Sequence, residues 1–174
     1  MRLFYSLILG FLLMPVFGVG QIYDPVDWSF SKKQISENTY ELTFIADIEP
    51  GWALYSNDIY NNGVDCEVEI CPIPVSFEFN KNNEAERYFS LLGNIVEVDE
   101  NKQVSQDPIF LMEVTKFIKR ATFKQIIKLN AENANVSGYL TFMVCDDTKC
   151  LPPTDVDFAF VFGEPKKQDT KIEN

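Results

Sequence analysis

Apolar and polar residues alternate along several short segments of the chain, and each such segment predicts a half-buried β-strand. The clearest of these segments extends from Tyr40 to Ile48, where every second residue is apolar, and ends at a turn formed by residues 49–51. Three further segments alternate in the same way: Val75 to Phe79, Ala121 to Leu129 and Val156 to Phe162. Weaker patterns predict four more strands, in residues 28–35, 52–57, 110–119 and 136–144.

These segments predict an all-β fold. About eight strands with one apolar face each must bury those faces against one another, and no segment shows a helical period, so we expect an antiparallel β-sandwich. Two segments interrupt the pattern, Asn61 to Pro74 and Asn80 to Asp107. The second is long and polar, with an apolar island from Tyr88 to Gly93 that is either part of a functional loop or one more strand edge packed on the core.

The first residues resemble an export signal. Arg2 precedes an apolar run from Leu3 to Phe17, and small residues follow at Gly18 and Gly20. We therefore expect residues 1–20 to be a signal peptide cleaved near Gly20 and Gln21, with an uncleaved N-terminal anchor as the alternative. Residues 21–163 then form one domain, and the polar residues 164–174 a disordered tail.

Charge and composition limit the partners and the kinds of catalysis that are possible for this chain. The formal net charge is −11, and such a surface repels nucleic acid, so no nucleic-acid partner is expected. The chain contains no histidine, which excludes Ser-His-Asp and Cys-His hydrolases and any zinc site with a histidine ligand. Catalysis would have to come from cysteine, carboxylate, lysine or tyrosine.

The chain has four cysteines in two pairs with the same C-x4-C spacing, Cys66 with Cys71 and Cys145 with Cys150. In an oxidising compartment they predict two disulfides, most simply within each pair, although four cysteines allow three connectivities. A zinc site built from all four thiolates is the less favoured alternative, because the chain is exported and lacks C-x2-C spacing. We expect no metal and no cofactor.

A bridge across so short a loop is a poor structural clamp. On the chain-entropy model it contributes about 2 kcal/mol, compared with roughly 4 for a long loop. A disulfide that closes a tight turn is also more easily reduced, which suits an exchange site. The argument applies equally to both pairs, so spacing alone does not identify the functional one.

The flanking residues favour the second pair. Cys145 ends the apolar segment 139–144, and Cys150 is followed by Leu151-Pro152-Pro153, which leads into the last predicted strand. The two aspartates after Cys145 would raise the pKa of a neighbouring thiol, whereas Lys149 would lower the pKa of Cys150. Cys150 is therefore the better candidate nucleophile.

Three segments, Met143 to Thr154, Ile48 to Tyr55 and Pro72 to Phe77, resemble the N-terminal periplasmic domain of the thiol:disulfide interchange protein DsbD, and the likeness extends from Val26 to Phe162. The resemblance implies an immunoglobulin-like β-sandwich in the periplasm with a link to cytochrome c biogenesis. It also implies a thioredoxin-like domain or a membrane electron-transfer protein as electron donor, and an exported thiol oxidoreductase as acceptor. The sulfur atoms carry both electrons, so neither metal nor cofactor is needed.

The resemblance also implies roles for individual residues. Cys150 would form the mixed disulfide with a partner, Cys145 would resolve it, and Tyr55 would line the site. In the family a cap loop with an aromatic residue near a glycine shields the cysteines. Here Gly93 matches that glycine, and the candidate cap residues are Tyr88, Phe89, Leu91 and Leu92.

The chain departs from the family pattern in three ways. Four residues separate Cys145 from Cys150, whereas the best-known members have five. The Cys66 and Cys71 pair is an addition, either a structural disulfide or a second redox site. The transmembrane and C-terminal thioredoxin-like domains of the full protein have no counterpart, so we expect electrons to arrive from a separate protein.

Two other functions stay open on the sequence. The chain could be an immunoglobulin-like protein- or peptide-binding module whose disulfides are inert, or a carbohydrate-binding sandwich that uses Trp28 or Trp52. If the cysteine pair is active, the chain is a protein-disulfide reductase or another component of thiol–disulfide interchange.

Overall fold

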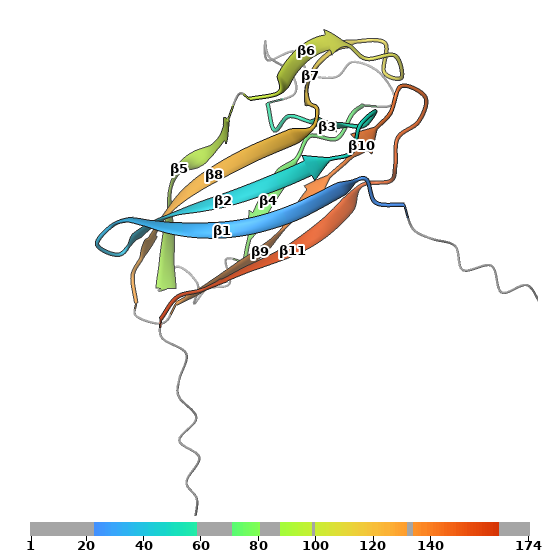
Figure 1. The fold of residues 1–174 in the computed structure, drawn as a ribbon. Helices are drawn as coiled ribbons and strands as arrows, with labels where there is room; N and C mark the ends of the chain where they lie inside the picture. Colours follow the sequence, from blue (N-terminus) through green and yellow to red (C-terminus); the bar gives the residue numbers. More distant parts are fainter. Residues whose placement is uncertain (1–22, 59–70, 81–87, 99, 132–133, 164–174) are drawn as a thin grey trace, which may run out of the picture.

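The computed structural model describes residues 23–58, 71–80, 88–98, 100–131 and 134–163 (Figure 1). These residues form eleven β-strands, arranged in three sheets whose paired strands are all antiparallel. The expected signal peptide, residues 1–20, and the expected tail, residues 164–174, lie outside the described residues. No helix among the described residues is long and apolar enough to cross a membrane.

Two of the sheets form the sandwich. The first has the strand order β1-β2-β8-β5, where β1 is Val26–Ser36, β2 is Thr39–Ile48, β8 is Arg120–Leu129 and β5 is Phe89–Val98. The second lies behind it in Figure 1 with the order β11-β9-β4, where β11 is Thr154–Val161, β9 is Asn135–Phe142 and β4 is Ser76–Phe79.

The core between these sheets is rich in phenylalanine. Phe44 on β2 is fully buried, and its ring lies 5.0 Å from those of Phe77 and Phe158, which come from the opposite sheet. In β2 and β8 every second residue is buried, as the alternation of the sequence predicts. Each buried phenylalanine contributes about 1.5–3 kcal/mol of hydrophobic stabilisation. The predicted antiparallel β-sandwich is confirmed.

The third sheet lies at one end of the sandwich and carries the cysteine pair. Its strand order is β10-β3-β7-β6, where β10 is Val144–Cys145, β3 is Ala53–Tyr55, β7 is Glu113–Phe117 and β6 is Lys102–Gln106 (Figure 1). The predicted strand 136–144 is therefore divided: β9 ends at Phe142, and β10 begins at Val144 in a different sheet. This change of sheet brings Cys145 to the end of the molecule.

The predicted loop from Asn80 to Asp107 contains two strands, β5 and β6. Its apolar island lies in β5, the edge strand that pairs with β8, and Phe89 is buried in the sandwich core. The strand-edge interpretation of the island is therefore the correct one. The register of β5 shifts between Leu92 and Val96, where Gly93 has a φ of +72°.

Candidate functional site

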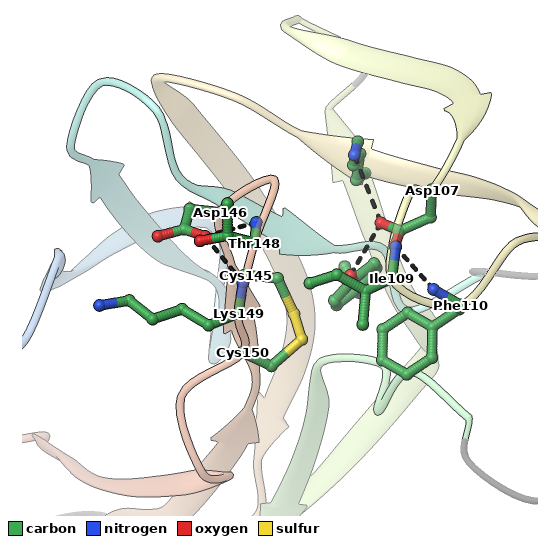
Figure 2. The surroundings of a disulfide bond; sticks show 10 residues. Asp107, Ile109, Phe110, Cys145, Asp146, Thr148, Lys149 and Cys150 are labelled. Atoms are coloured by element: carbon green, nitrogen blue, oxygen red, sulfur yellow. Dashed lines mark hydrogen bonds and ion pairs between the residues drawn. A yellow bond between two sulfur atoms is a disulfide. The ribbon is translucent and has the colours of Figure 1, made fainter.

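Cys145 and Cys150 form a disulfide with a Cα–Cα distance of 4.0 Å (Figure 2). Cys145 is held in the sheet, because β10 pairs with β3 through Cys145 opposite Ala53 and Val144 opposite Leu54. Cys150 pairs only with Cys145, as an isolated bridge. The Leu151 N–H donates to the Val144 carbonyl at 2.9 Å and closes the base of the loop.

Asp146 organises the loop between the two cysteines. Its N–H donates to the Lys149 carbonyl at 2.9 Å. Its carboxylate accepts hydrogen bonds from the Thr148 hydroxyl at 2.7 Å, the Thr148 N–H at 2.7 Å and the Lys149 N–H at 2.8 Å (Figure 2). These bonds, chiefly the one from the Thr148 hydroxyl, lower the pKa of Asp146. The loop is thus held by an ionised side chain of its own.

The two cysteines of the disulfide differ in their exposure to solvent. Cys145 is 3% exposed, whereas Cys150 is half-buried. Thiol–disulfide exchange begins when a thiolate attacks one sulfur atom, and access decides which sulfur is attacked. The geometry therefore favours attack at Cys150.

A small apolar cluster surrounds the disulfide, separate from the sandwich core. Besides the two cysteines it contains Tyr55 of β3 and five residues near β7 and β10: Ile109, Phe110, Met112, Val114 and Met143. Ile109 and Phe110 belong to the turn between β6 and β7, and Figure 2 shows this turn on the side of the disulfide opposite Lys149.

Beneath this turn lies a buried polar pair, Tyr55 and Asp107. The Tyr55 hydroxyl donates to the Asp107 carboxylate at 2.9 Å, and burial, together with that carboxylate, raises the pKa of Tyr55. Burial also pushes the pKa of Asp107 upward. Hydrogen bonds from the Phe110 N–H at 3.2 Å, the Ile109 N–H at 3.0 Å and Tyr55, together with the charge of Lys116 at 3.4 Å, outweigh that effect and lower the pKa of Asp107 overall. The carboxylate is therefore ionised at neutral pH.

No family model and no curated protein matches the sequence. Among solved structures, the chain is similar to the N-terminal periplasmic domain of ScsB from Proteus mirabilis, with a TM-score of 0.53 and 14% identity over 79% of this chain and 46% of that one. It is also similar to the N-terminal domain of Neisseria meningitidis DsbD in the reduced form, with a TM-score of 0.50 and 15% identity over 82% of this chain and 92% of that one. The chain has the fold of these domains. It spans about half the length of the ScsB chain.

Within this DsbD-like fold, the structure brings Tyr55 and both cysteines into one cluster. The candidate cap residues lie elsewhere, at the start of β5, where Phe89 and Leu91 pack on the sandwich core while Tyr88 and Leu92 are exposed. None of these four belongs to the cluster around the disulfide, and their cap role stays a prediction.

The Lys149 side chain does not approach the sulfur atoms. Figure 2 shows it extending away from the disulfide, and its ammonium nitrogen lies 5.8 Å from the centroid of the Trp52 ring. Trp52 is buried and also contacts Tyr23, with ring centroids 5.5 Å apart. The structure thus directs the Lys149 charge towards an aromatic ring at the rim of the site.

Sequence reasoning missed the turn that begins at Asp107. The Asp-Pro dipeptide at residues 107–108 favours a turn, whereas the hydrophobic pattern predicts only the end of a loop at Asp107 and the start of a strand at Phe110. In the structure β7 begins at Glu113.

Cys71 has no free thiol, and its expected partner, Cys66, lies outside the described residues.

Proposed function

We propose that this chain is an exported thiol–disulfide exchange domain that relays electrons through Cys145 and Cys150. A thioredoxin-like domain or a membrane electron-transfer protein would reduce the pair, and an exported oxidoreductase would reoxidise it. The observation that carries the proposal is a half-buried Cys150 bonded to a fully buried Cys145 in a DsbD-like fold. A periplasmic location is consistent with the similar ScsB domain, which is periplasmic.

Reduction of the pair proceeds in two steps. A donor thiolate attacks the sulfur of Cys150, the bond to Cys145 breaks, and Cys145 leaves as a thiolate. The donor's second thiolate then attacks the donor's own sulfur in the mixed disulfide, which forms the donor's disulfide and frees Cys150. Two electrons have then moved to the pair, and protons from solvent complete the dithiol.

Transfer to the acceptor repeats the same chemistry in the other direction. The Cys150 thiolate attacks the acceptor disulfide and expels one acceptor thiolate. Cys145 then attacks the sulfur of Cys150, reforms the original disulfide and releases the second acceptor thiolate. The surroundings of Cys150 are apolar and the Lys149 charge points elsewhere, so selectivity would come from docking of the partner more than from activation of the thiol.

The decisive measurement is the reduction potential of each cysteine pair. The protein is equilibrated in glutathione and dithiothreitol buffers, its free thiols are alkylated, and the labelled peptides are assigned by mass. An exchange site should equilibrate between about −120 and −270 mV, whereas a structural disulfide resists reduction until about −300 mV or below. A potential of the second kind for Cys145 with Cys150 would refute the relay and favour the binding module.

The same titration tests the first pair. We propose that Cys66 and Cys71 form a structural disulfide, which should stay oxidised at potentials that reduce Cys145 and Cys150. If both pairs titrate together, the first is a second redox site instead.

Trapping variants test which cysteine meets the partner. Cys145→Ala leaves Cys150 without its resolving thiol, so an oxidised thioredoxin-like protein should accumulate as a mixed disulfide at Cys150. The matched variant Cys150→Ala leaves only the buried Cys145 and should trap much less. Equal trapping by both variants would contradict the assignment of Cys150 as the point of exchange.

A further inference from the structure

We infer that Asp146 is a positioning residue that keeps Cys145 and Cys150 close together after their disulfide is reduced, and so sets how readily the bond forms again. The inference rests on the proposed function and deepens it, because a relay must restore its disulfide each time it passes electrons on. Its basis is a set of hydrogen bonds that Asp146 makes inside the loop between the two cysteines.

The hydrogen bonds to the Asp146 side chain all converge on one oxygen. Oδ1 accepts the Thr148 N–H and the Thr148 hydroxyl, both at 2.7 Å, and the Lys149 N–H at 2.8 Å (Figure 2). The backbone of Asp146 closes the same turn, since its N–H donates to the Lys149 carbonyl at 2.9 Å. Aspartate and asparagine suit this first position of a turn, because their short side chains reach the N–H groups that follow.

None of these bonds involves a sulfur atom, so reduction of the disulfide leaves them in place. Cys145 is held by its pairing with β3, whereas Cys150 pairs only with Cys145 in the described part of the chain. Once the S–S bond breaks, the position of Cys150 depends on the loop that precedes it and on the hydrogen bond at the base of that loop. Asp146 controls the loop, because it binds both the N–H and the carbonyl of Lys149, the residue next to Cys150.

The fraction of reduced chains in which the loop is closed sets the equilibrium constant for forming the disulfide. The bond forms only from chains whose two sulfur atoms can meet, so the observed constant scales with that fraction. Removal of a side-chain acceptor of this kind typically changes such a local equilibrium about fivefold. We therefore expect Asp146→Ala to lower the constant about fivefold, which makes the reduction potential of this two-electron couple about 20 mV less negative.

The negative charge of Asp146 is the competing explanation, and three variants separate charge from hydrogen bonding. Asp146→Asn loses the charge but keeps an oxygen that can accept all three bonds, so its constant should stay close to that of the unaltered chain. Asp146→Glu keeps the charge, but its longer side chain does not fit the turn, so it should behave like Asp146→Ala. Asp147→Ala is the matched control and should have no effect, because Asp147 is exposed in the same loop and makes no hydrogen bond or ion pair with the described residues.

The measurement uses glutathione as the partner thiol, at neutral pH. Its thiolate attacks the sulfur of Cys150 and leaves Cys145 as a thiolate; in the reverse step Cys145 attacks Cys150, expels the glutathione thiolate and restores the disulfide. Samples at equilibrium are quenched with acid and alkylated, and the dithiol, mixed-disulfide and disulfide forms are quantified by mass. The ratio of disulfide to mixed disulfide, multiplied by the concentration of reduced glutathione, gives the constant for each variant.

The constants of Asp146→Asn and Asp147→Ala should match that of the unaltered chain and exceed those of Asp146→Ala and Asp146→Glu. An unchanged constant in Asp146→Ala would overturn the inference, and so would an equal fall in Asp146→Asn or Asp147→Ala, because charge would then explain the result. If Asp146→Ala does not fold, Asp146→Glu decides in its place. A potential near −300 mV or below in the unaltered chain would refute the relay, while the differences in potential between variants, measured in dithiothreitol buffers, would still decide the role of Asp146.

Discussion

Gly138 provides the sharpest test of how the sandwich is packed. It lies on β9 between β4 and β11, opposite Phe79 on one side and Phe158 on the other. A Cβ atom on Gly138 would overlap the Glu78 carbonyl oxygen and lie 2.7 Å from a ring carbon of Phe158. The first of these atoms belongs to the backbone, so Gly138→Ala can be accommodated only if β4 moves away from β9.

We expect a large loss of stability from Gly138→Ala. Overpacking of a buried site costs about 1–3 kcal/mol, and a clash with backbone places this variant at the upper end. For a domain of this size, 3 kcal/mol corresponds to a fall of roughly 10 °C in melting temperature. The measurement is thermal unfolding monitored by circular dichroism, with urea denaturation as a second, independent experiment.

Gly93→Ala is the matched control. Gly93 has a φ of +72°, and its Cβ position has no atom within 4 Å, so alanine there introduces backbone strain without a clash. That strain costs about 1 kcal/mol, equivalent to roughly 3 °C. If Gly138→Ala melts at the temperature of the unaltered chain, or Gly93→Ala proves the more damaging of the two, the packing of β4 on β9 described above is wrong.

Three side chains near the disulfide provide further tests. The pKa of Asp107 is lowered in the folded chain, so its ionised form stabilises the fold above pH about 4. This stability is lost as the pH falls through the pKa of the folded state. The melting temperatures of the chain and of Asp107→Asn should therefore converge in acid. Phe110→Ala removes a buried ring and should cost about 3 kcal/mol in urea denaturation; a cost below about 1 would mean that the ring does not pack on Tyr55. Lys149→Gln should leave the alkylation rate of reduced Cys150 unchanged, since the ammonium group of Lys149 lies over Trp52. A tenfold fall in that rate would show that Lys149 activates the Cys150 thiol.

Most of the sandwich was predictable from the sequence. In residues 42–48 and 121–129 every second residue is buried, and all of these except Gln125 are apolar, because a sheet with one face in solvent requires a period of two. The pattern of β5, in contrast, predicts a long polar loop rather than a strand. β5 is an edge strand in which Phe89 is buried but Leu92 and Val96 are exposed, so its sequence resembles that of a polar loop.

The site was predictable only in part. The flanking residues favour Cys145 and Cys150 as the functional pair, because they are adjacent in the sequence, whereas the spacing of this pair is the same as that of Cys66 and Cys71. The turn at Asp107 meets the disulfide only through the pairing of β3 with both β7 and β10, which joins segments far apart in the chain. The direction of the Lys149 side chain likewise depends on Trp52, which precedes β3 and is remote in sequence.

The unequal anchoring of the two cysteines has a consequence for the lifetime of a covalent complex. Cys145 is fixed by the ladder between β10 and β3, and its Cα lies 4.0 Å from that of Cys150. A thiol held so close has a high effective concentration towards any disulfide formed at Cys150. A partner joined to Cys150 would therefore be released quickly. Quick release suits a protein that carries out many exchange reactions in succession rather than one that remains covalently bound to its partner.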